Sequence, residues 1–166
     1  MNRAGFVIHS AIHASQPEAH CVMHTHTTTG MAVACLKDGL SPHNFYGAML
    51  HGQVAYHDFE GITVEPGEKE RLVRDIGDKR AVILRNHGLL AWGRDVAAGL
   101  PHALDAAARL RRADRGEPPR ARSIRCRPQA FAQSVRESGP GEKRTCEDVF
   151  AAMQRLVDAR DPSYRD

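Results

Sequence analysis

Short apolar stretches, each ending at a turn residue or a proline, divide the N-terminal part of the chain into alternating helices and strands. Apolar residues recur at helical spacing from Ala4 to Ala14, and Pro17 marks the end of that helix. The run from His20 to His24 predicts a strand. Met31 to Leu36 then predicts a buried helix, capped by one of the threonines at positions 27–29.

The middle of the chain continues this pattern less regularly. Ser41 to Gly52 has no clear period and predicts no element, whereas Gln53 to Phe59 alternates well enough for a strand. Pro66 and Glu68 favour the start of a helix, and Gly77 is a natural end for it.

Two further apolar runs predict a pair of antiparallel strands. Ala81 to Leu84 and Leu89 to Trp92 are separated only by the tight connection at residues 86–88. Asp95 is then placed to cap another helix. This irregular alternation favours an α/β or α+β domain over an all-α or all-β one.

The chain changes character after Gly99. Residues 99–145 are Arg- and Pro-rich with little apolar surface to bury, so we expect this segment to be disordered. A helical stripe from Cys146 to Ala159 predicts a C-terminal helical tail at residues 146–166.

The net charge of +3 conceals an uneven distribution. Between Arg109 and Arg127, eight arginines accompany two acids, a local balance of +6, so the remaining residues sum to −3. Basic tracts of this kind can indicate nucleic-acid binding. This one lacks interleaved aromatic residues and any binding motif, so we expect a solvated segment and no nucleic-acid partner.

The bulk composition indicates one domain with a real core, since 42% of the 166 residues are hydrophobic. No apolar run reaches the roughly eighteen residues of a membrane span, and the N-terminus lacks the apolar region of a signal peptide. Four scattered cysteines without a CxxC pair indicate reduced thiols. We therefore expect a soluble cytoplasmic protein without a membrane partner.

Histidines gather where predicted strands end. His24 and His26 share one face because they lie at i and i+2 of an extended segment, and His87 follows another strand. Three neutral imidazoles leave a divalent metal with open positions, which is typical of a catalytic site. We predict that these three residues bind Zn²⁺ or another divalent first-row metal.

Other polar residues are candidates for supporting roles. His9 and His13 lie four apart on the first predicted helix and offer a second metal-binding pair, but no glutamate lies between them. We interpret His9 as a residue that lines or supports the site. The candidate proton-transfer groups, none of which the sequence places, are His9, Tyr56, His57, Asp58 and Glu60.

Four strings together resemble the class II aldolase/adducin family: GFVIHSAIH, VMHTHTTTGMAVA, GITVEPGEKERL and AVILRNHGLLAWG. The similarity covers Ala4 to Val96, and the last twenty residues are similar to the C-terminus of the adducin-like bacterial branch. The resemblance implies a three-layer α/β/α class II aldolase-like domain with a mainly antiparallel central sheet, incomplete at the N-terminus. Residues 1–98 would form this partial core.

The resemblance also implies a chemistry. In sugar-phosphate aldolases of the family, the equivalents of His24, His26 and His87 hold zinc. The expected function is therefore that of a metal-dependent lyase, acting on a small hydroxy-carbonyl compound, sugar or sugar-phosphate-like, by metal-stabilised enediolate chemistry. Members commonly form tetramers, so a homo-oligomer is expected.

Two departures leave the activity open. The family's proton-transfer glutamate lies nineteen residues before the first histidine of the pair, and here that position is Gly5. The family's phosphate-binding residues lie largely upstream of this point. The catalytic residue is therefore unassigned, and two alternatives stand beside the lyase: a non-catalytic adducin-like association domain and an inactive fragment. The atypical composition from about Ala98 to Lys143 also suggests a reading frame lost and regained.

Overall fold

A four-stranded mixed sheet in the order β1-β4-β3-β2 lies at the centre of the molecule. β4 pairs antiparallel with both β1 and β3, whereas β2 runs parallel to β3 at the opposite edge from β1. The computed structural model describes residues 3–42, 45–61, 66–99, 133 and 142–165. The strands are β1 (Cys21–Thr25), β2 (Val54–His57), β3 (Ala81–Leu84) and β4 (Gly88–Gly93).

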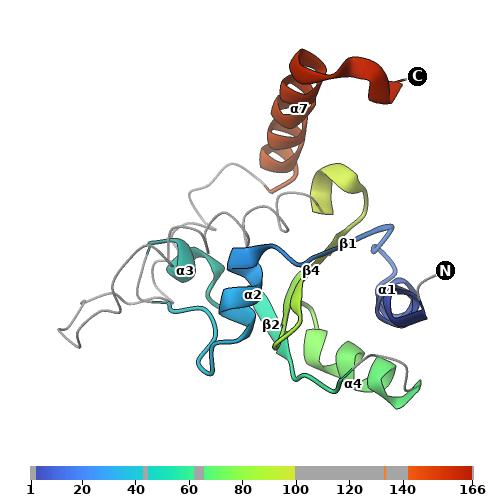
Figure 1. Ribbon diagram of the computed structural model, residues 1–166, viewed down its shortest axis with the longest axis vertical. Coiled ribbons are helices and arrows are strands. Elements are labelled where there is room, and N and C mark those ends of the chain that lie inside the picture. The colour runs from blue at the N-terminus through green and yellow to red at the C-terminus, as the bar shows by residue number, and fades with distance from the viewer. Residues whose placement is uncertain (1–2, 43–44, 62–65, 100–132, 134–141, 166) are drawn as a thin grey trace.

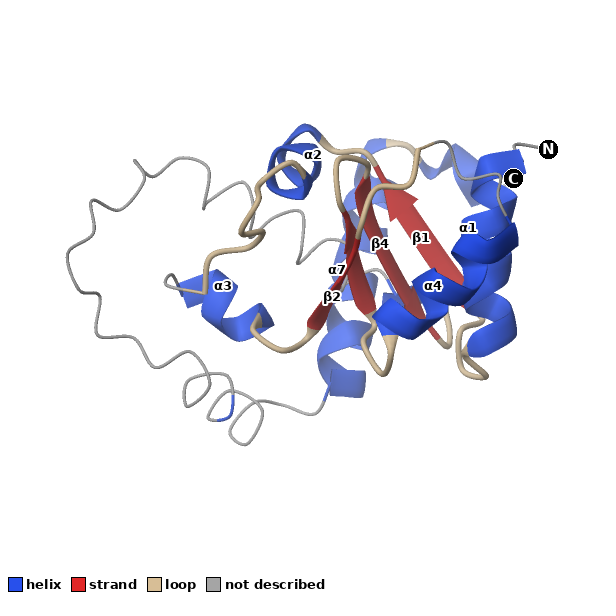
Figure 2. Cartoon of the chain, turned by 90° about the horizontal axis from the view of Figure 1, so that it is seen from below, coloured by secondary structure: helices blue, strands red, loops and turns tan. Residues whose placement is uncertain are grey.

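Helices cover both faces of this sheet (Figures 1 and 2). On one face α1 (Arg3–Ser15) packs beside α4 (Pro66–Ile76), and α4 also contacts β2. On the other face α2 (Thr28–Ala34) contacts β4. The expected three-layer α/β/α arrangement with a mainly antiparallel sheet is therefore confirmed.

The sheet is apolar on both faces because each face is covered by a helical layer. Leu90 is 2% exposed and belongs to the cluster formed with α1 and α4, while its neighbour Leu89 packs with Val33 of α2. Successive strand residues point to opposite faces, so both must be apolar here. The largest fully buried side chains of the described core are Ile12, Leu72, Ile76, Val82 and Leu90.

The predicted ends of several elements are confirmed. The hydroxyl of Thr27 caps α2 by accepting a hydrogen bond from the backbone N–H of Gly30 at 3.2 Å. Gly77 follows the last residue of α4 with a φ of 54°, a left-handed conformation that glycine adopts readily. Asp95 precedes a helical turn at residues 96–99 and accepts from the N–H of Ala98 at 2.7 Å.

Two helices differ from the sequence expectation. α3 (Phe45–Leu50) lies within a segment for which no element was predicted, because six residues are too few to display a helical period. α7 (Glu142–Arg160) begins four residues before the predicted start at Cys146, and a 3₁₀ helix, η1 (Pro162–Arg165), follows it. Most of the segment expected to be disordered, residues 100–132 and 134–141, lies outside the described residues.

In the part of the chain that the structure describes, none of the helices combines the length and apolar character needed to cross a membrane.

Candidate metal centre

The three predicted ligands come together at one end of the paired strands β1 and β4. His24 lies on β1, His26 follows that strand directly, and His87 lies in the turn before β4. The antiparallel register places His24 opposite Leu90, which brings the turn that carries His87 beside the end of β1. One nitrogen from each imidazole lies within 4.8 Å of the others.

The ring of His24 is held in one orientation by the neighbouring strand. Its Nδ1 donates a hydrogen bond to the carbonyl oxygen of Leu89 at 3.0 Å, so in the neutral ring Nε2 carries the lone pair. That Nε2 lies 2.7 Å from Nε2 of His26. Two such nitrogens approach this closely when they share either a proton or a cation. A backbone carbonyl behind a histidine is also the usual support for a metal ligand.

Gly88 allows the backbone and the imidazoles to approach one another. A Cβ atom at this position would lie 2.6 Å from the carbonyl oxygen of Thr25 and 2.8 Å from Cδ2 of His26. Both distances are too short for a real side chain. The arrangement of the three rings therefore depends on glycine at this position.

The turn that carries His87 is fixed by backbone hydrogen bonds. Asn86 has a φ of 54°, and asparagine tolerates this left-handed conformation better than most residues. Its N–H donates to the carbonyl oxygen of Ala34 at the end of α2, at 2.9 Å. The N–H of His87 donates to Leu84 at 3.1 Å, which closes the turn.

The surroundings keep two of the rings neutral at ordinary pH. Burial lowers the pKa of His24 to about 4, with a smaller contribution from His87. Burial also lowers the pKa of His87, assisted by His26 and opposed by Glu68. Neutral imidazoles offer their lone pairs to a metal without first losing a proton. Among the described residues, these three histidines are the one group that satisfies the geometry of a metal site.

The alternative pair on α1 is directed elsewhere. Nδ1 of His13 donates to the carbonyl oxygen of Ala19 at 2.5 Å, so this ring supports the loop after α1. His9 is half-buried, and burial followed by the effect of His13 lowers its pKa. It also contributes to the lowered pKa of His24.

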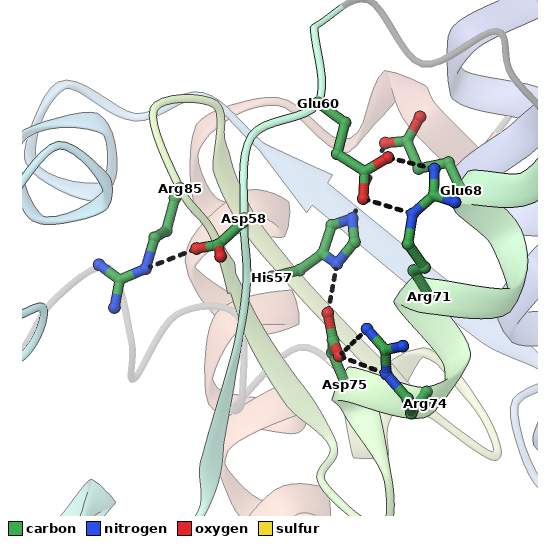
Figure 3. Close-up of polar contacts among 8 residues, drawn as sticks. All are labelled: His57, Asp58, Glu60, Glu68, Arg71, Arg74, Asp75 and Arg85. Carbon is green, nitrogen blue, oxygen red and sulfur yellow. Dashed lines mark hydrogen bonds and ion pairs between the residues drawn. The ribbon is translucent and has the colours of Figure 1, made fainter.

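Three of the candidate proton-transfer groups have structural partners. The hydroxyl of Tyr56 accepts a hydrogen bond from the N–H of Leu40 at 2.9 Å. The carboxylate of Asp58 pairs with Nε of Arg85 at 3.3 Å, and that of Glu60 accepts a hydrogen bond from Nε of Arg71 at 2.7 Å (Figure 3).

His57 belongs to a buried polar cluster that the sequence analysis missed. Its Nδ1 donates to Oδ2 of Asp75 at 2.8 Å, and its Nε2 lies 3.8 Å from Oε1 of Glu68 (Figure 3). His57 is 4% exposed and Glu68 is 5% exposed. One signal was available: Glu68, Leu72 and Asp75 follow helical spacing, which puts both acids on the face of α4 that packs inward.

A pocket extends from this cluster to His87 of the three-histidine centre. Its walls include both His57 and His87, and its charged lining residues are Asp58, Glu60, Glu68 and Arg85. The pocket has room for a group about the size of a water molecule. The centre therefore has a polar neighbour on the side of α4.

Comparison with known proteins places these features in a family. Residues 1–112 match the family described as Class II Aldolase and Adducin N-terminal domain. A putative aldolase class 2 protein of Caulobacter vibrioides is 47% identical over 97 residues, which cover 58% of this chain and 38% of that protein. Alpha-adducin of Rattus norvegicus is 46% identical over 97 residues, covering 58% of this chain and 13% of that protein. The chain thus spans well under half the length of these relatives.

Two solved structures share the fold. An aldolase II superfamily protein from Pseudomonas syringae superposes with a TM-score of 0.82 at 36% identity, covering 100% of this chain and 67% of the other. The L-fuculose 1-phosphate aldolase from Glaciozyma antarctica gives a TM-score of 0.74 at 25% identity, covering 96% of this chain and 61% of the other.

Proposed function

This chain belongs to the class II aldolase and adducin family, and from that premise we propose that it binds Zn²⁺ through His24, His26 and His87. We further propose that the bound centre acts as a lyase on a small hydroxy-carbonyl compound. The convergence of the three imidazoles within 4.8 Å is the observation that carries the proposal.

The donor set fits such an ion. Three neutral nitrogen ligands suit zinc or another first-row divalent metal and leave positions open for a substrate. When bound, the ion would supply positive charge that stabilises negative charge developing on the oxygens of a hydroxy-carbonyl compound. His24 contributes a pre-oriented Nε2 because the carbonyl of Leu89 holds its other nitrogen.

The class of substrate is supported by similarity. The Glaciozyma antarctica structure is that of an L-fuculose 1-phosphate aldolase, and it shares 25% identity and the fold. Gly5 departs from the family pattern, because glycine has no side chain to transfer a proton. A lyase built on this chain therefore requires a proton-transfer group from another position.

A second candidate is a non-catalytic association domain. It is favoured by Gly5 and by the 46% identity to alpha-adducin over 97 residues. In this case the histidine cluster would brace the fold, and the protein would assemble with itself or a partner without turnover. A homo-oligomer, of the tetrameric kind expected for the family, is compatible with both candidates.

Metal analysis of the purified full chain tests the proposal. We expect stoichiometric zinc in the wild-type protein, and loss of that zinc in His24→Ala and His87→Ala. The matched control is His20→Ala, because His20 is exposed and lies outside the cluster. Wild-type protein that binds no zinc at micromolar concentrations contradicts the proposal.

A proton-exchange assay then separates the two candidates. Zinc-loaded protein is incubated in deuterated water with dihydroxyacetone, simple hydroxyketones or dihydroxyacetone phosphate, and incorporation of deuterium at carbon is followed by NMR. Exchange supports the lyase. Bound zinc without exchange on any compound, together with a defined oligomer by light scattering, supports the association domain.

A further inference from the structure

His57 is the one histidine of the described chain with a buried nitrogen that has no hydrogen-bond partner. Its other nitrogen is fixed, because Nδ1 donates to Oδ2 of Asp75 at 2.8 Å. In the neutral ring this arrangement leaves the lone pair on Nε2. A carboxylate that holds Nδ1–H while Nε2 stays available is the arrangement of an oriented proton acceptor.

The free nitrogen faces the pocket that also reaches the metal centre. Nε2 lies on the side of the ring toward Glu60 and Glu68, away from Asp75 (Figure 3). Both of these acids line the pocket, and so does His87. The room available is that of a water molecule or a hydroxyl group, so the pocket suits one hydroxyl of a larger compound.

The charges around the pocket disfavour a phosphate. Its described walls carry three carboxylates, Asp58, Glu60 and Glu68, against one guanidinium. That guanidinium, on Arg85, already contacts Asp58 and donates to the carbonyl oxygens of Leu36 and Lys37. Arg71 neutralises Glu60, which still leaves two carboxylates against Arg85. An uncharged ligand therefore fits this pocket better than an anionic one.

We infer that the pocket binds a hydroxyl group of an uncharged hydroxy-carbonyl compound, and that His57 is the catalytic proton acceptor for that hydroxyl. This inference rests on the proposed function and supplies the group that Gly5 lacks. In the step, the O–H bond breaks and its electron pair stays on the oxygen. The proton forms a new bond to Nε2 of His57. Asp75 balances the positive charge of the imidazolium that results.

The competing explanation is purely structural, since the His57–Asp75 hydrogen bond also ties β2 to α4. A structural role requires only the Nδ1 contact and makes no use of Nε2. The two explanations therefore differ in what happens at Nε2 when a ligand is added.

The first test observes that nitrogen directly. The full chain is labelled with ¹⁵N-histidine, loaded with zinc and titrated with dihydroxyacetone, and the Nε2 resonance of His57 is assigned by comparison with His57→Gln. We expect this resonance to move and to saturate, with a much weaker response to dihydroxyacetone phosphate. An unmoved resonance at saturating dihydroxyacetone overturns the inference, and so does a stronger response to the phosphate ester.

The second test measures deuterium exchange of dihydroxyacetone, in which the hydroxyl proton passes to His57 and the neighbouring carbon-bound proton passes to solvent, so that an enediolate forms and its carbon then takes up deuterium. His57→Gln should lower kcat for exchange by about 10²-fold or more while zinc content stays at the wild-type value. Asp75→Asn keeps the imidazole, so it should lower kcat less, by about tenfold, and alter the tautomer seen by ¹⁵N NMR. His20→Gln is the matched control and should exchange at the wild-type rate.

These outcomes distinguish a failure of His57 as the proton acceptor from a failure of the proposed function. If His57→Gln exchanges deuterium at the wild-type rate, His57 is not the proton acceptor, and the proposed function still stands. If the zinc-loaded wild-type protein shows no exchange, the role of His57 is also overturned. Failure of the wild-type protein to bind zinc counts against the proposed function itself. The Asp75→Asn variant keeps the test decisive if His57→Gln does not fold.

Discussion

Nδ1 of His24 donates to the carbonyl oxygen of Leu89 at 3.0 Å, across the boundary between β1 and β4. The pairing of these strands therefore builds the sheet and also determines which nitrogen of His24 is free. Changes that disturb the strand ends should affect the metal centre, whereas changes elsewhere in the core should affect stability alone.

Gly88→Ala should weaken metal binding. The added Cβ atom would meet the backbone oxygen of Thr25 and the ring of His26, so the rings must move apart. We expect the zinc Kd to rise at least tenfold, as it does when outer contacts of metal ligands are lost. A competition titration against a chromogenic chelator measures this. Gly52→Ala is the control: it places a side chain at a φ of 74° with nothing within 4 Å, so it should reduce stability and leave zinc affinity unchanged.

The metal-free protein should become less stable as the pH is lowered, because of His24. The pKa of this residue is about 4 when folded, below its ordinary value of 6.5. Between these pH values the unfolded chain binds a proton that the folded chain excludes, so the free energy of unfolding decreases as pH falls through that window. Above about pH 6.5, His24 is neutral in both states and does not change the free energy of unfolding.

The measurement compares the wild type with His24→Gln in the presence of a chelator. Urea unfolding at about pH 7 and about pH 4.5 should show a larger loss in the wild type, by on the order of 2 kcal/mol. Equal losses in the two proteins would mean that His24 titrates normally in the folded state.

Asp75→Asn should destabilise the fold more than Asp78→Asn. Partial burial raises the pKa of Asp75, but the hydrogen bond from His57 and the contacts with Arg74 outweigh this and lower it. Loss of that charge-assisted hydrogen bond should cost about 1–2 kcal/mol in urea unfolding. The side chain of Asp78 is 86% exposed and pairs with the neighbouring Lys79, so its replacement should leave the free energy of unfolding nearly unchanged. Similar losses in both variants would contradict the assignment.

Leu72→Ala should strongly destabilise the layer formed by α1 and α4. Leu72 is 1% exposed and packs in the cluster between these helices and the sheet. Truncation of such a side chain costs about 2–5 kcal/mol. Leu36→Ala, at a residue that is 52% exposed, should change stability by less than about 0.5 kcal/mol. Thermal unfolding of both variants measures this difference, and we expect a large fall in melting temperature for Leu72→Ala alone.

Much of the fold could be read from the sequence where local signals agree with packing. Thr27 and Gly77 mark helix ends through cap chemistry that depends only on neighbouring residues. The tight turn at Asn86 likewise joined two strands whose pairing needs no distant information. α3 was not predicted, because its six residues are too few to show a helical period of apolar positions.

The three histidines of the candidate centre could be predicted from the sequence, whereas the polar contacts beside them could not. Spacing put His24 and His26 on one face, and the place of His87 directly after another predicted strand indicated the third ligand. The partners of His57 could not be found in this way, because Glu68 and Asp75 lie on a different element and face β2 only after α4 has packed. Such contacts depend on tertiary structure that a local pattern does not contain.

Because β1 pairs with β4, a metal ion bound by the three histidines would act as a crosslink. His26 and His87 are separated by 61 residues, so an ion shared between them ties the two ends of a long loop. Closing a loop of this length lowers the entropy of the chain, and a bound ion holds the ends together. Unfolding would then release the ion, so the melting temperature should rise with free zinc concentration by mass action. The same coupling means that a chelator present during purification would act on the association of β1 with the sheet as well as on the centre.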